Sequence, residues 1–296
     1  MQLGIDAGAT RTKWSLAEGG KIVARGESCA LTGHVFTTEQ RQDALDRLEN
    51  LAARFRDGRP GVTVTRVVAG VTGVEQGEGA ALTLRALIAR VLSLPAEAVT
   101  VQSDLRLAFL AHHPPGQGVL LYVGTGSIAY HLDARGQAFR AGGYGHLLGD
   151  EGGALWLARQ AMRQLLRQRD EGVPPTSVLA RKFAHALGDL DWPTLRAFTY
   201  GGERDAFAAL APLVSEAAAE GDPTAQALLQ EGARELVRLV HCVLQHAPQA
   251  TSITASGGAF TDALLELVRA ELPTALSLKR SAVHVSDANA RHSPDP

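Results

Sequence analysis

The sequence predicts an α/β protein composed of two related halves. Strand and helix patterns alternate along roughly the first hundred residues, which is typical of α/β folds. A short strand that runs directly into a glycine turn occurs near the start of each half, at residues 2–10 and again at 119–127. Between them, the tract 113–118 contains two prolines and two glycines and marks a domain boundary. We therefore predict domains at residues 1–115 and 116–296, a division that the length of 296 residues allows.

The elements of the first half follow from its hydrophobic pattern. Residues 39–56 repeat apolar side chains at helical spacing, and residues 79–92 form a second apolar helix that ends before Pro95. Residues 63–71 are rich in valine and threonine, which favours a buried strand. In chain order, strands are predicted at 2–6, 12–17, 21–27, 63–71 and 98–102, and helices at 39–56, 79–92 and 105–112.

The second half begins with strands and continues mainly with helices. Residues 119–123 form a continuous apolar strand. The clearest helix, 223–246, has Asp222 at its N-cap and Pro223 at its first position, and Pro248 ends it. Further strands are predicted at 129–133, 138–140 and 252–256, further helices at 154–167 and 261–272, and residues 288–296 are expected to be loose.

Composition argues against several classes of function. Lysine and arginine (29) nearly balance aspartate and glutamate (31) and are dispersed, so there is no basic footprint for nucleic acid. No uncharged apolar run reaches the roughly 18 residues of a membrane span, and the chain reaches Asp6 without the pattern of a signal peptide. Two cysteines are too few for a disulfide scaffold or a zinc site. We expect a cytoplasmic protein without nucleic-acid or membrane partners.

The most informative segment is residues 141–156, AGGYGHLLGDEGGALW. Six glycines surround the adjacent carboxylates Asp150 and Glu151, just before an apolar run. Glycine lets the backbone approach a ligand closely but costs stability, so a purely structural segment has little use for so many. A carboxylate pair at the start of a predicted helix is also favoured by the helix dipole, and helix capping stays open as the alternative.

Shorter glycine turns have the composition of phosphate-binding loops. Residues 4–13 contain no Gly-Lys-Ser/Thr sequence and so are not a Walker A loop. Their backbone N–H groups and the Thr10 hydroxyl would still suit phosphate oxygens, and Asp6 at a strand end would suit a hydrated Mg²⁺. Residues 124–127 have the same form, and a glycine pair at 257–258 follows a later strand. An ordinary glycine hairpin is the alternative for each turn, but together the turns favour a nucleotide site.

Asp104 is a lone carboxylate at a strand-to-helix junction. Aspartates at such junctions often only cap the helix. The functional alternative is a general base, which accepts the proton of a substrate hydroxyl while a phosphoryl group is transferred. A serine hydrolase is disfavoured, because Ser256 lacks the leading glycine of a nucleophile elbow.

Taken in order, these segments resemble the N-acetylglucosamine kinase family, of the BadF/BadG/BcrA/BcrD type, within the superfamily of sugar kinases and actin-like ATPases. The resemblance spans residues 2–270 and is most specific at 142–152, GGYGHLLGDEG, which looks like the family's Gly-Gly-Trp-Gly-His-x-x-Gly-Asp-Glu-Gly signature. It implies two ribonuclease-H-like (actin-like ATPase) domains with ATP and sugar in the cleft between them. It also implies an ATP-dependent, Mg²⁺-dependent kinase that forms the 6-phosphate of an amino sugar, N-acetylglucosamine first.

The resemblance further implies roles for individual residues. Asp104 occupies the position of the family's catalytic base, and Asp6 is the expected Mg²⁺ ligand. The implied ATP contacts are Asp6, Gly8, Ala9, Thr10, Lys13, Gly124, Thr125, Gly126, Ser127, Gly257, Gly258 and Phe260. The implied sugar contacts are His34, Asp104, Gly143, Tyr144, Gly145 and Asp150.

Four departures from the family pattern concern the sugar side and the C-terminus. Gly33 stands where the family usually offers an asparagine to the sugar, Ile128 replaces a polar residue, and Tyr144 replaces tryptophan. Residues 287–290 do not look like the small-residue helix that usually closes these chains. The lost polar groups predict weaker discrimination of the sugar substituent at C2.

Three alternatives stay open. The first is a glucosamine kinase. The second is an ATPase that activates a partner enzyme, as the related activators with an intersubunit iron–sulfur cluster do. Cys29 lies too early for a cluster and Cys242 sits on an apolar helical stripe, which disfavours this alternative. The third is a sugar-sensing relative without catalysis, and the presence of Asp104 and both phosphate turns argues against it. The oligomeric state is open, with a homodimer among the possibilities.

Overall fold

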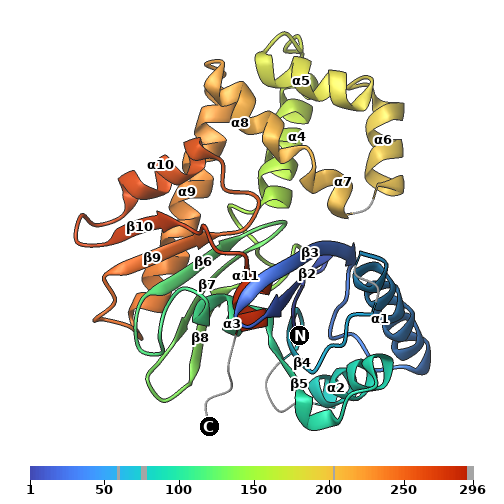
Figure 1. The fold of residues 1–296 in the computed structure, drawn as a ribbon. Helices are drawn as coiled ribbons and strands as arrows, with labels where there is room; N and C mark the ends of the chain where they lie inside the picture. Colours follow the sequence, from blue (N-terminus) through green and yellow to red (C-terminus); the bar gives the residue numbers. More distant parts are fainter. Residues whose placement is uncertain (59–60, 75–78, 203, 292–296) are drawn as a thin grey trace. The chain divides into compact units, whose positions relative to one another are not determined.

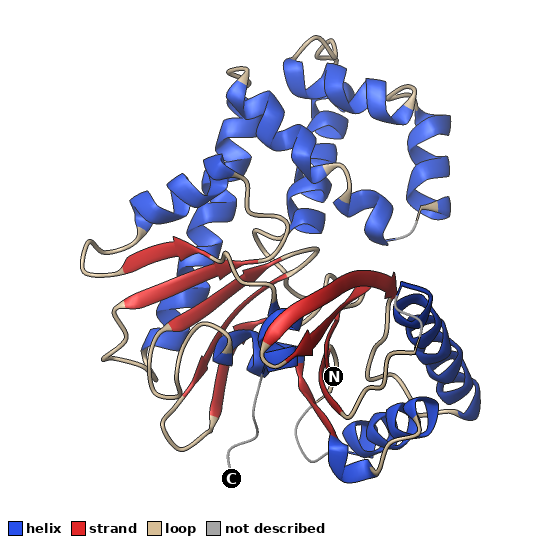
Figure 2. Cartoon of the chain, viewed as in Figure 1, coloured by secondary structure: helices blue, strands red, loops and turns tan. Residues whose placement is uncertain are grey.

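The computed structural model describes residues 1–58, 61–74, 79–202 and 204–291 (Figure 1). The chain forms two compact units, one from residues 1–113 with 282–291 and the other from residues 114–281. Each unit is built on a five-stranded mixed sheet accompanied by helices (Figure 2). The predicted α/β class is therefore confirmed. None of the helices among the described residues is both long enough and apolar enough to cross a membrane.

The first sheet has the strand order β3-β2-β1-β4-β5. An antiparallel meander is followed by two strands parallel to its first member: β1 (Gln2–Ala7), β2 (Arg11–Glu18), β3 (Lys21–Cys29), β4 (Arg66–Val71) and β5 (Val99–Ser103). The short η1 (Ala96–Ala98) precedes β5. One face of the sheet is covered by α1 (Thr38–Gly58) and α2 (Gly79–Leu92). Leu3 and Ile5 of β1 are fully buried on this face in one apolar cluster with Phe55.

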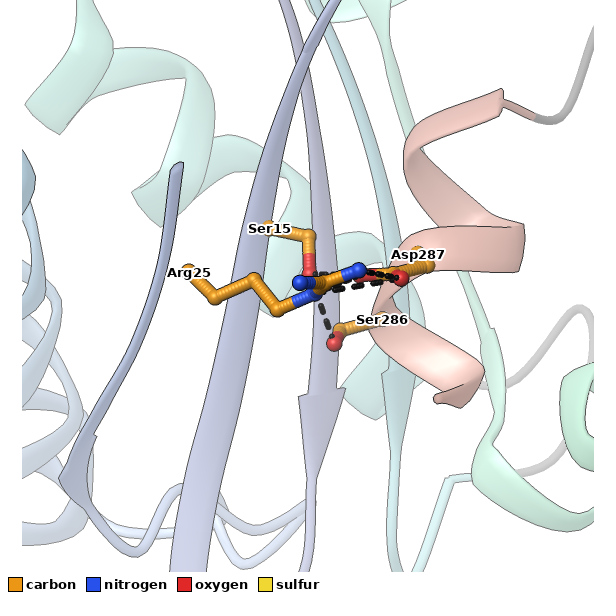
Figure 3. A network of polar contacts seen from close by, with 4 residues as sticks. All are labelled: Ser15, Arg25, Ser286 and Asp287. Carbon is orange, nitrogen blue, oxygen red and sulfur yellow. Dashed lines mark hydrogen bonds and ion pairs between the residues drawn. The ribbon is translucent and has the colours of Figure 1, made fainter. Parts of the chain in front are cut away.

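The opposite face of the first sheet carries α11 (Val285–Arg291), the last helix of the described chain (Figure 1). A Cβ on Gly4 of β1 would lie 2.0 Å from the Ser286 carbonyl oxygen, so only glycine allows the helix this close. Asp287 accepts hydrogen bonds from the Ser15 hydroxyl at 2.6 Å and from the Arg25 Nη2 at 2.6 Å, and the two serine hydroxyls are 2.9 Å apart (Figure 3). The helix is thus held to the sheet by paired polar groups.

The expectation of a loose tail is wrong for residues 288–291, and residues 292–296 lie outside the described part. Residues 287–290, which do not look like the small-residue helix that usually closes such chains, lie in the helix α11. Asn289 is buried, and its Nδ2 donates to the Ile5 carbonyl at 2.7 Å. A polar helix whose side chains are buried by pairing has no apolar stripe that would reveal it in the sequence. The division into units also differs from the predicted one. Residues 282–291, which contain this polar helix, belong to the first unit.

The second sheet repeats the topology of the first, with the order β10-β9-β6-β7-β8. The meander is β6 (Val119–Val123), β7 (Ser127–Leu132) and β8 (Ala138–Gly142), and the strands parallel to β6 are β9 (Ser252–Ser256) and then β10 (Ser277–Arg280). The match between the sheets confirms the prediction of two related halves. The strand β10 was not predicted, because only Leu278 of its four residues is buried.

Helices make up the rest of the second unit (Figures 1 and 2). They are α4 (Ala154–Asp170), α5 (Val178–Leu187), α6 (Trp192–Gly201), α7 (Arg204–Ala208), α8 (Ala211–Ala219), α9 (Pro223–Leu244) and α10 (Asp262–Glu271). The predicted N-cap of α9 is present, since Asp222 accepts from the Ala225 N–H at 3.0 Å. The same buried carboxylate also accepts from the Leu179 N–H at the start of α5, at 2.9 Å, and so joins two helices.

Candidate functional site

The predicted site residues fall into two groups, one in each unit. In the first unit they gather where β1, β4 and β5 end. These strands are parallel, with Asp6 opposite Gly70, and Thr72 after β4 donates its N–H to the Ala7 carbonyl at 2.9 Å. A Cβ on Gly70 would lie 3.1 Å from the Cα of Asp104. Because glycine has no Cβ, β4 and α3 (Asp104–Leu110) can approach closely here. The carboxyl ends of parallel strands are where open α/β sheets bind ligands.

Asp104 is the first residue of α3. Its Oδ1 accepts a hydrogen bond from the Leu105 N–H at 2.8 Å, and the Thr72 hydroxyl donates a second one. Ser103 occupies the N-cap position, so Asp104 is not the cap of this helix. Burial raises the pKa of Asp104 to about 6, and the charge of Asp6 contributes to the rise. A carboxyl group with this pKa is mostly ionised at neutral pH and is basic enough to accept a proton.

Asp6 is the second carboxylate at this edge. Burial raises its pKa, and Lys13, directly opposite it in the antiparallel register with β2, partly lowers it. Within the described ranges, no group of three or more His, Cys, Asp or Glu side chains is arranged to hold a metal ion. Mg²⁺ keeps several waters and usually takes only one or two protein carboxylates beside substrate phosphates. The single hard oxygen donor of Asp6 therefore fits the expected ion.

The turn after β1 is a tight hairpin with an exposed tip. The Gly8 N–H donates to the Arg11 carbonyl at 3.0 Å, and Ala9 and Thr10 are exposed. The backbone of the tip is accessible, as a loop that contacts phosphate requires.

The loop that carries His34 is attached to the same edge. The Gly33 N–H donates to the Thr72 carbonyl at 2.9 Å, and His34 itself is exposed. A Cβ on Gly33 would lie 2.4 Å from the Gly73 carbonyl oxygen. The departure from the family's asparagine therefore has a steric cause, since this backbone leaves no room for a side chain at position 33.

In the second unit, the turn 124–127 packs against the start of α4. The carbonyls of Gly124 and Thr125 accept hydrogen bonds from the first N–H groups of α4, at 3.0 Å and 3.1 Å. The Ser127 hydroxyl donates to the Glu151 carbonyl at 2.6 Å. Since the carbonyls of the turn are used in this way, and no hydrogen bond is described for the N–H groups of Thr125 and Gly126, the turn has donors left for an anion.

Asp150 lies directly against this turn. A Cβ on Gly126 would lie 2.4 Å from the Asp150 Cγ, so the turn must be glycine for the carboxylate to occupy this place. Asp150 has a φ of +67°, a left-handed conformation that non-glycine residues rarely adopt. It is 4% exposed, and its Oδ2 lies 3.6 Å from the Arg204 Nη2 on α7. The cap of α4 is Gly153, so Asp150 is not the helix cap that the sequence left open.

The remaining predicted residues of this unit border the same turn to different degrees. The Gly143 N–H donates to the Ser127 carbonyl at 2.9 Å, and a Cβ on Gly143 would lie 2.7 Å from Ile128 Cδ1. The isoleucine that replaces a polar residue thus packs against the glycine signature. Tyr144 is 67% exposed, and Gly145 beside it has a φ of +87°.

The glycine pair after β9 lies beside the end of β6. A Cβ on Gly257 would lie 2.2 Å from the Val123 carbonyl oxygen, and the Ala259 N–H donates to that carbonyl at 3.1 Å. Gly258 is exposed, whereas the Phe260 side chain is buried in the apolar core of the unit. The side chain of Phe260 therefore serves packing, and the exposed part of this turn is its glycine backbone.

Two residues of these groups were missed by sequence reasoning. Thr72 directly follows the buried strand β4, as Asp104 follows β5, and that position was a usable signal. Arg204 lies 54 residues after Asp150 in a chain with many arginines, and no local pattern distinguishes it.

Comparison with known proteins identifies the family of this chain. The sequence profile of the BadF/BadG/BcrA/BcrD ATPase family matches residues 3–285. The chain belongs to this ATPase family. The resemblance inferred from the glycine signature is thereby confirmed.

Curated relatives of this chain include two sugar kinases. An N-acetylmuramic acid/N-acetylglucosamine kinase of Clostridium acetobutylicum is 29% identical over 165 residues, and the match covers 54% of each protein, so the chain spans about half the length of that relative. An N-acetyl-D-glucosamine kinase of Dictyostelium discoideum is 26% identical over 257 residues, covering 82% of this chain and 79% of the relative.

Solved structures share the fold. A candidate N-acetylglucosamine kinase from Chromobacterium violaceum superposes with a TM-score of 0.77 at 26% identity, covering 98% of this chain and 97% of the other. A ROK family glucokinase from Streptomyces griseus, solved with glucose and AMPPNP, has a TM-score of 0.63 at 18% identity, covering 98% and 97%. The second likeness concerns the fold alone, and it agrees with the predicted sugar-kinase and actin-like ATPase class.

Proposed function

We propose that this ATPase transfers the γ-phosphoryl group of ATP to the 6-hydroxyl of N-acetylglucosamine. The observation that carries the proposal is the carboxyl group of Asp104. It lies at the carboxyl edge of the first sheet beside Asp6, holds two hydrogen bonds, and has a pKa of about 6. These are the properties of a general base that works near neutral pH.

The reaction requires one proton acceptor and several groups that bind phosphate. The sugar oxygen forms a bond to the γ-phosphorus while the bond from that phosphorus to the bridging oxygen breaks, and ADP leaves. The hydroxyl proton passes to the carboxylate of Asp104. Such transfers need little covalent chemistry from the protein, so most of the rate enhancement comes from positioning and charge neutralisation.

We assign the phosphate groups to the backbone of the glycine turns at 8–10 and 124–127. Support comes from the exposed tip of the first turn and the N–H groups left over in the second. Asp6 would hold a hydrated Mg²⁺, which supplies positive charge to the phosphoryl group when it is bound. Lys13, opposite Asp6 on β2, would add positive charge near the same phosphates.

We assign the sugar to residues 143–150, with Asp150 accepting hydrogen bonds from its hydroxyl groups, and to His34 on the first unit. N-acetylglucosamine is preferred because the names of both curated relatives include it. Glucosamine is the second candidate, since Gly33 and Ile128 supply no polar side chain to read the acetamido group.

A panel of sugars tests the proposal by ADP release. With ATP and Mg²⁺, we expect turnover with N-acetylglucosamine to exceed turnover with glucosamine and glucose. The variant Asp104→Asn should lose about 10²–10⁴-fold in kcat and bind ATP as before, because it keeps the shape but accepts no proton. The matched control is Asp46→Asn on the exposed surface of α1. If Asp104→Asn kept half of the activity, or no amino sugar released ADP, the proposal would be wrong.

The same material tests the alternative of an ATPase that activates a partner. Cys29 is exposed on β3 and Cys242 lies in α9, so the cysteines are far apart in the sequence and on different units. An activator would hydrolyse ATP without sugar and contain iron. We expect neither in the purified protein, by ADP release without sugar and by metal analysis.

A further inference from the structure

Thr72 stands directly after β4, at the edge of the first sheet that carries the proposed general base. The register pairs the last residue of β4 with the last residue of β5, so Thr72 and Asp104 follow side by side. The Thr72 N–H donates to the Ala7 carbonyl at 2.9 Å, and its carbonyl accepts from the Gly33 N–H at 2.9 Å. The backbone of Thr72 is therefore fixed from both sides, by β1 and by the loop that carries His34.

The chain turns sharply around Thr72. The Val74 N–H donates to the Val71 carbonyl at 3.3 Å, and Gly73 between them has a φ of +76°. A glycine with positive φ at the third position is typical of a type II turn. The branched side chain of threonine has few rotamers. The hydroxyl of Thr72 is thus presented from a backbone and a side chain that both have little freedom.

This hydroxyl completes the attachment of the Asp104 carboxylate. The Leu105 N–H donates to the Asp104 Oδ1 at 2.8 Å from within α3, and the Thr72 hydroxyl donates from the end of the neighbouring strand. One hydrogen bond leaves a carboxylate free to rotate about that bond, whereas two donors from different elements fix its plane. Since an ionised carboxylate has about four acceptor positions, roughly two remain for a substrate hydroxyl.

We propose that Thr72 is a positioning residue for the general base: its hydroxyl holds the Asp104 carboxylate in the orientation that receives the substrate proton. The inference rests on the proposed function, because it requires that Asp104 accepts this proton. A displacement of about 1 Å at a reacting group can cost ~10²-fold in rate, so a single orienting hydrogen bond matters for turnover. The same bond favours the ionised carboxyl and so opposes the burial that raises its pKa.

The charges around Asp104 set the background for this effect. Asp6 on β1 raises the pKa of Asp104, and Lys13 on β2 lies opposite Asp6. The helix α3 contacts β4, β5 and α11. The other charged side chains of these four elements are Arg66, Arg106, Asp287 and Arg291, and none of these described side chains is among the groups that shift the pKa of Asp104.

Two variants of Thr72 and one control test the proposal. Thr72→Val keeps the shape and the backbone contacts but has no hydroxyl, and Thr72→Ser keeps the hydroxyl. The control is Thr65→Val, since Thr65 is exposed just before β4 and its hydroxyl donates to the Met1 carbonyl at 3.2 Å. The measurements are kcat and KM against pH with ATP and N-acetylglucosamine, and the titration of the Asp104 carboxyl by carbon NMR without substrate.

We expect Thr72→Val to lower kcat about 10-fold to 100-fold and to leave the KM for ATP within about twofold of wild type, because the base is misplaced but the phosphate turns are not touched. The acid limb of the pH profile and the NMR midpoint of Asp104 should both move up by about one pH unit, since the lost hydrogen bond favoured the ionised form. Thr72→Ser should stay within about threefold of wild type, and Thr65→Val should match it.

The outcomes separate this inference from the proposed function. If wild type phosphorylated the amino sugar and Thr72→Val kept its kcat and pH profile, the inference would be overturned and the proposed function would stand. It would also be overturned if Thr72→Ser lost as much activity as Thr72→Val, or if the NMR midpoint of Asp104 did not move in Thr72→Val. A wild-type protein without turnover of any amino sugar would refute the proposed function, and the inference with it.

Discussion

Replacing Asp104 by asparagine should stabilise the protein at neutral pH while it removes activity. The ordinary pKa of this carboxyl is 3.8, and burial raises it to about 6 in the folded chain. At about 1.4 kcal/mol for each pKa unit, the folded state is destabilised by about 3 kcal/mol once Asp104 is ionised. Asparagine keeps an oxygen for the Leu105 N–H and the Thr72 hydroxyl, but it carries no charge.

The sign of the effect follows from linkage. Because the pKa is raised on folding, the stability that protonated Asp104 contributes is fully present below 3.8 and is lost as the pH rises through about 6. Wild type should therefore lose stability between pH 4 and pH 7, whereas Asp104→Asn should not show this loss. At pH 7.5 the variant should be more stable than wild type by up to about 3 kcal/mol, and near pH 4 the difference should nearly vanish.

Urea unfolding of wild type, Asp104→Asn and the surface control Asp46→Asn at pH 4.5, 6 and 7.5 measures this difference. The control should follow wild type at each pH, since Asp46 is exposed. A variant whose stability differs from wild type by the same amount at all three pH values would refute the reasoning. So would a variant that is less stable than wild type at pH 7.5.

Further predictions follow from other contacts. The activity of wild type should fall as the pH drops below about 6, because protonated Asp104 accepts no proton, and a profile of kcat/KM against pH checks this. Gly126→Ala should reduce kcat/KM at least 10-fold, since its Cβ would lie 2.4 Å from the Asp150 Cγ, whereas Gly58→Ala, with open space around it, should not. Asp287→Asn should lower the free energy of unfolding by about 1–2 kcal/mol at neutral pH, because charge-assisted hydrogen bonds are lost. The lowered pKa of Asp287 makes its contribution disappear as the pH falls through the folded pKa, so urea unfolding should show wild type and variant converging in acid.

The parts of this molecule that could be predicted are those whose signal is local. Apolar runs and helical spacing located most strands and the helices that pack on them, because burial of one face imposes a period on the sequence. The glycine turns could also be recognised in the sequence. Gly126 and Gly257 must be glycine, because a Cβ at either position would lie within 2.4 Å of a neighbouring atom. Asp6 was found because it stands near the end of a buried strand, and Asp104 because it follows one.

The parts that could not be predicted depend on contacts between distant residues. Arg204 approaches Asp150 only because α7 packs on α4, and nothing in the local sequence indicates that packing. The helix α11 is held by side chains from β2 and β3, so its polar composition resembles that of an exposed tail. The steric exclusion at Gly33 likewise depends on Gly73, which lies 40 residues away.

The position of α11 also has a consequence for synthesis of the chain. The polar contacts that hold α11 to the first sheet join residues 262 to 284 positions apart, from Arg25 to Asp287 and from Ile5 to Asn289. The second unit, by contrast, is one continuous stretch, residues 114–281. A ribosome that has released the first 113 residues has thus produced a sheet whose strand β1 still lacks the helix α11 on one face, and this part of the face stays open until almost the whole chain has emerged. The second unit can complete its fold first, and the strand that carries Asp6 receives its covering helix last.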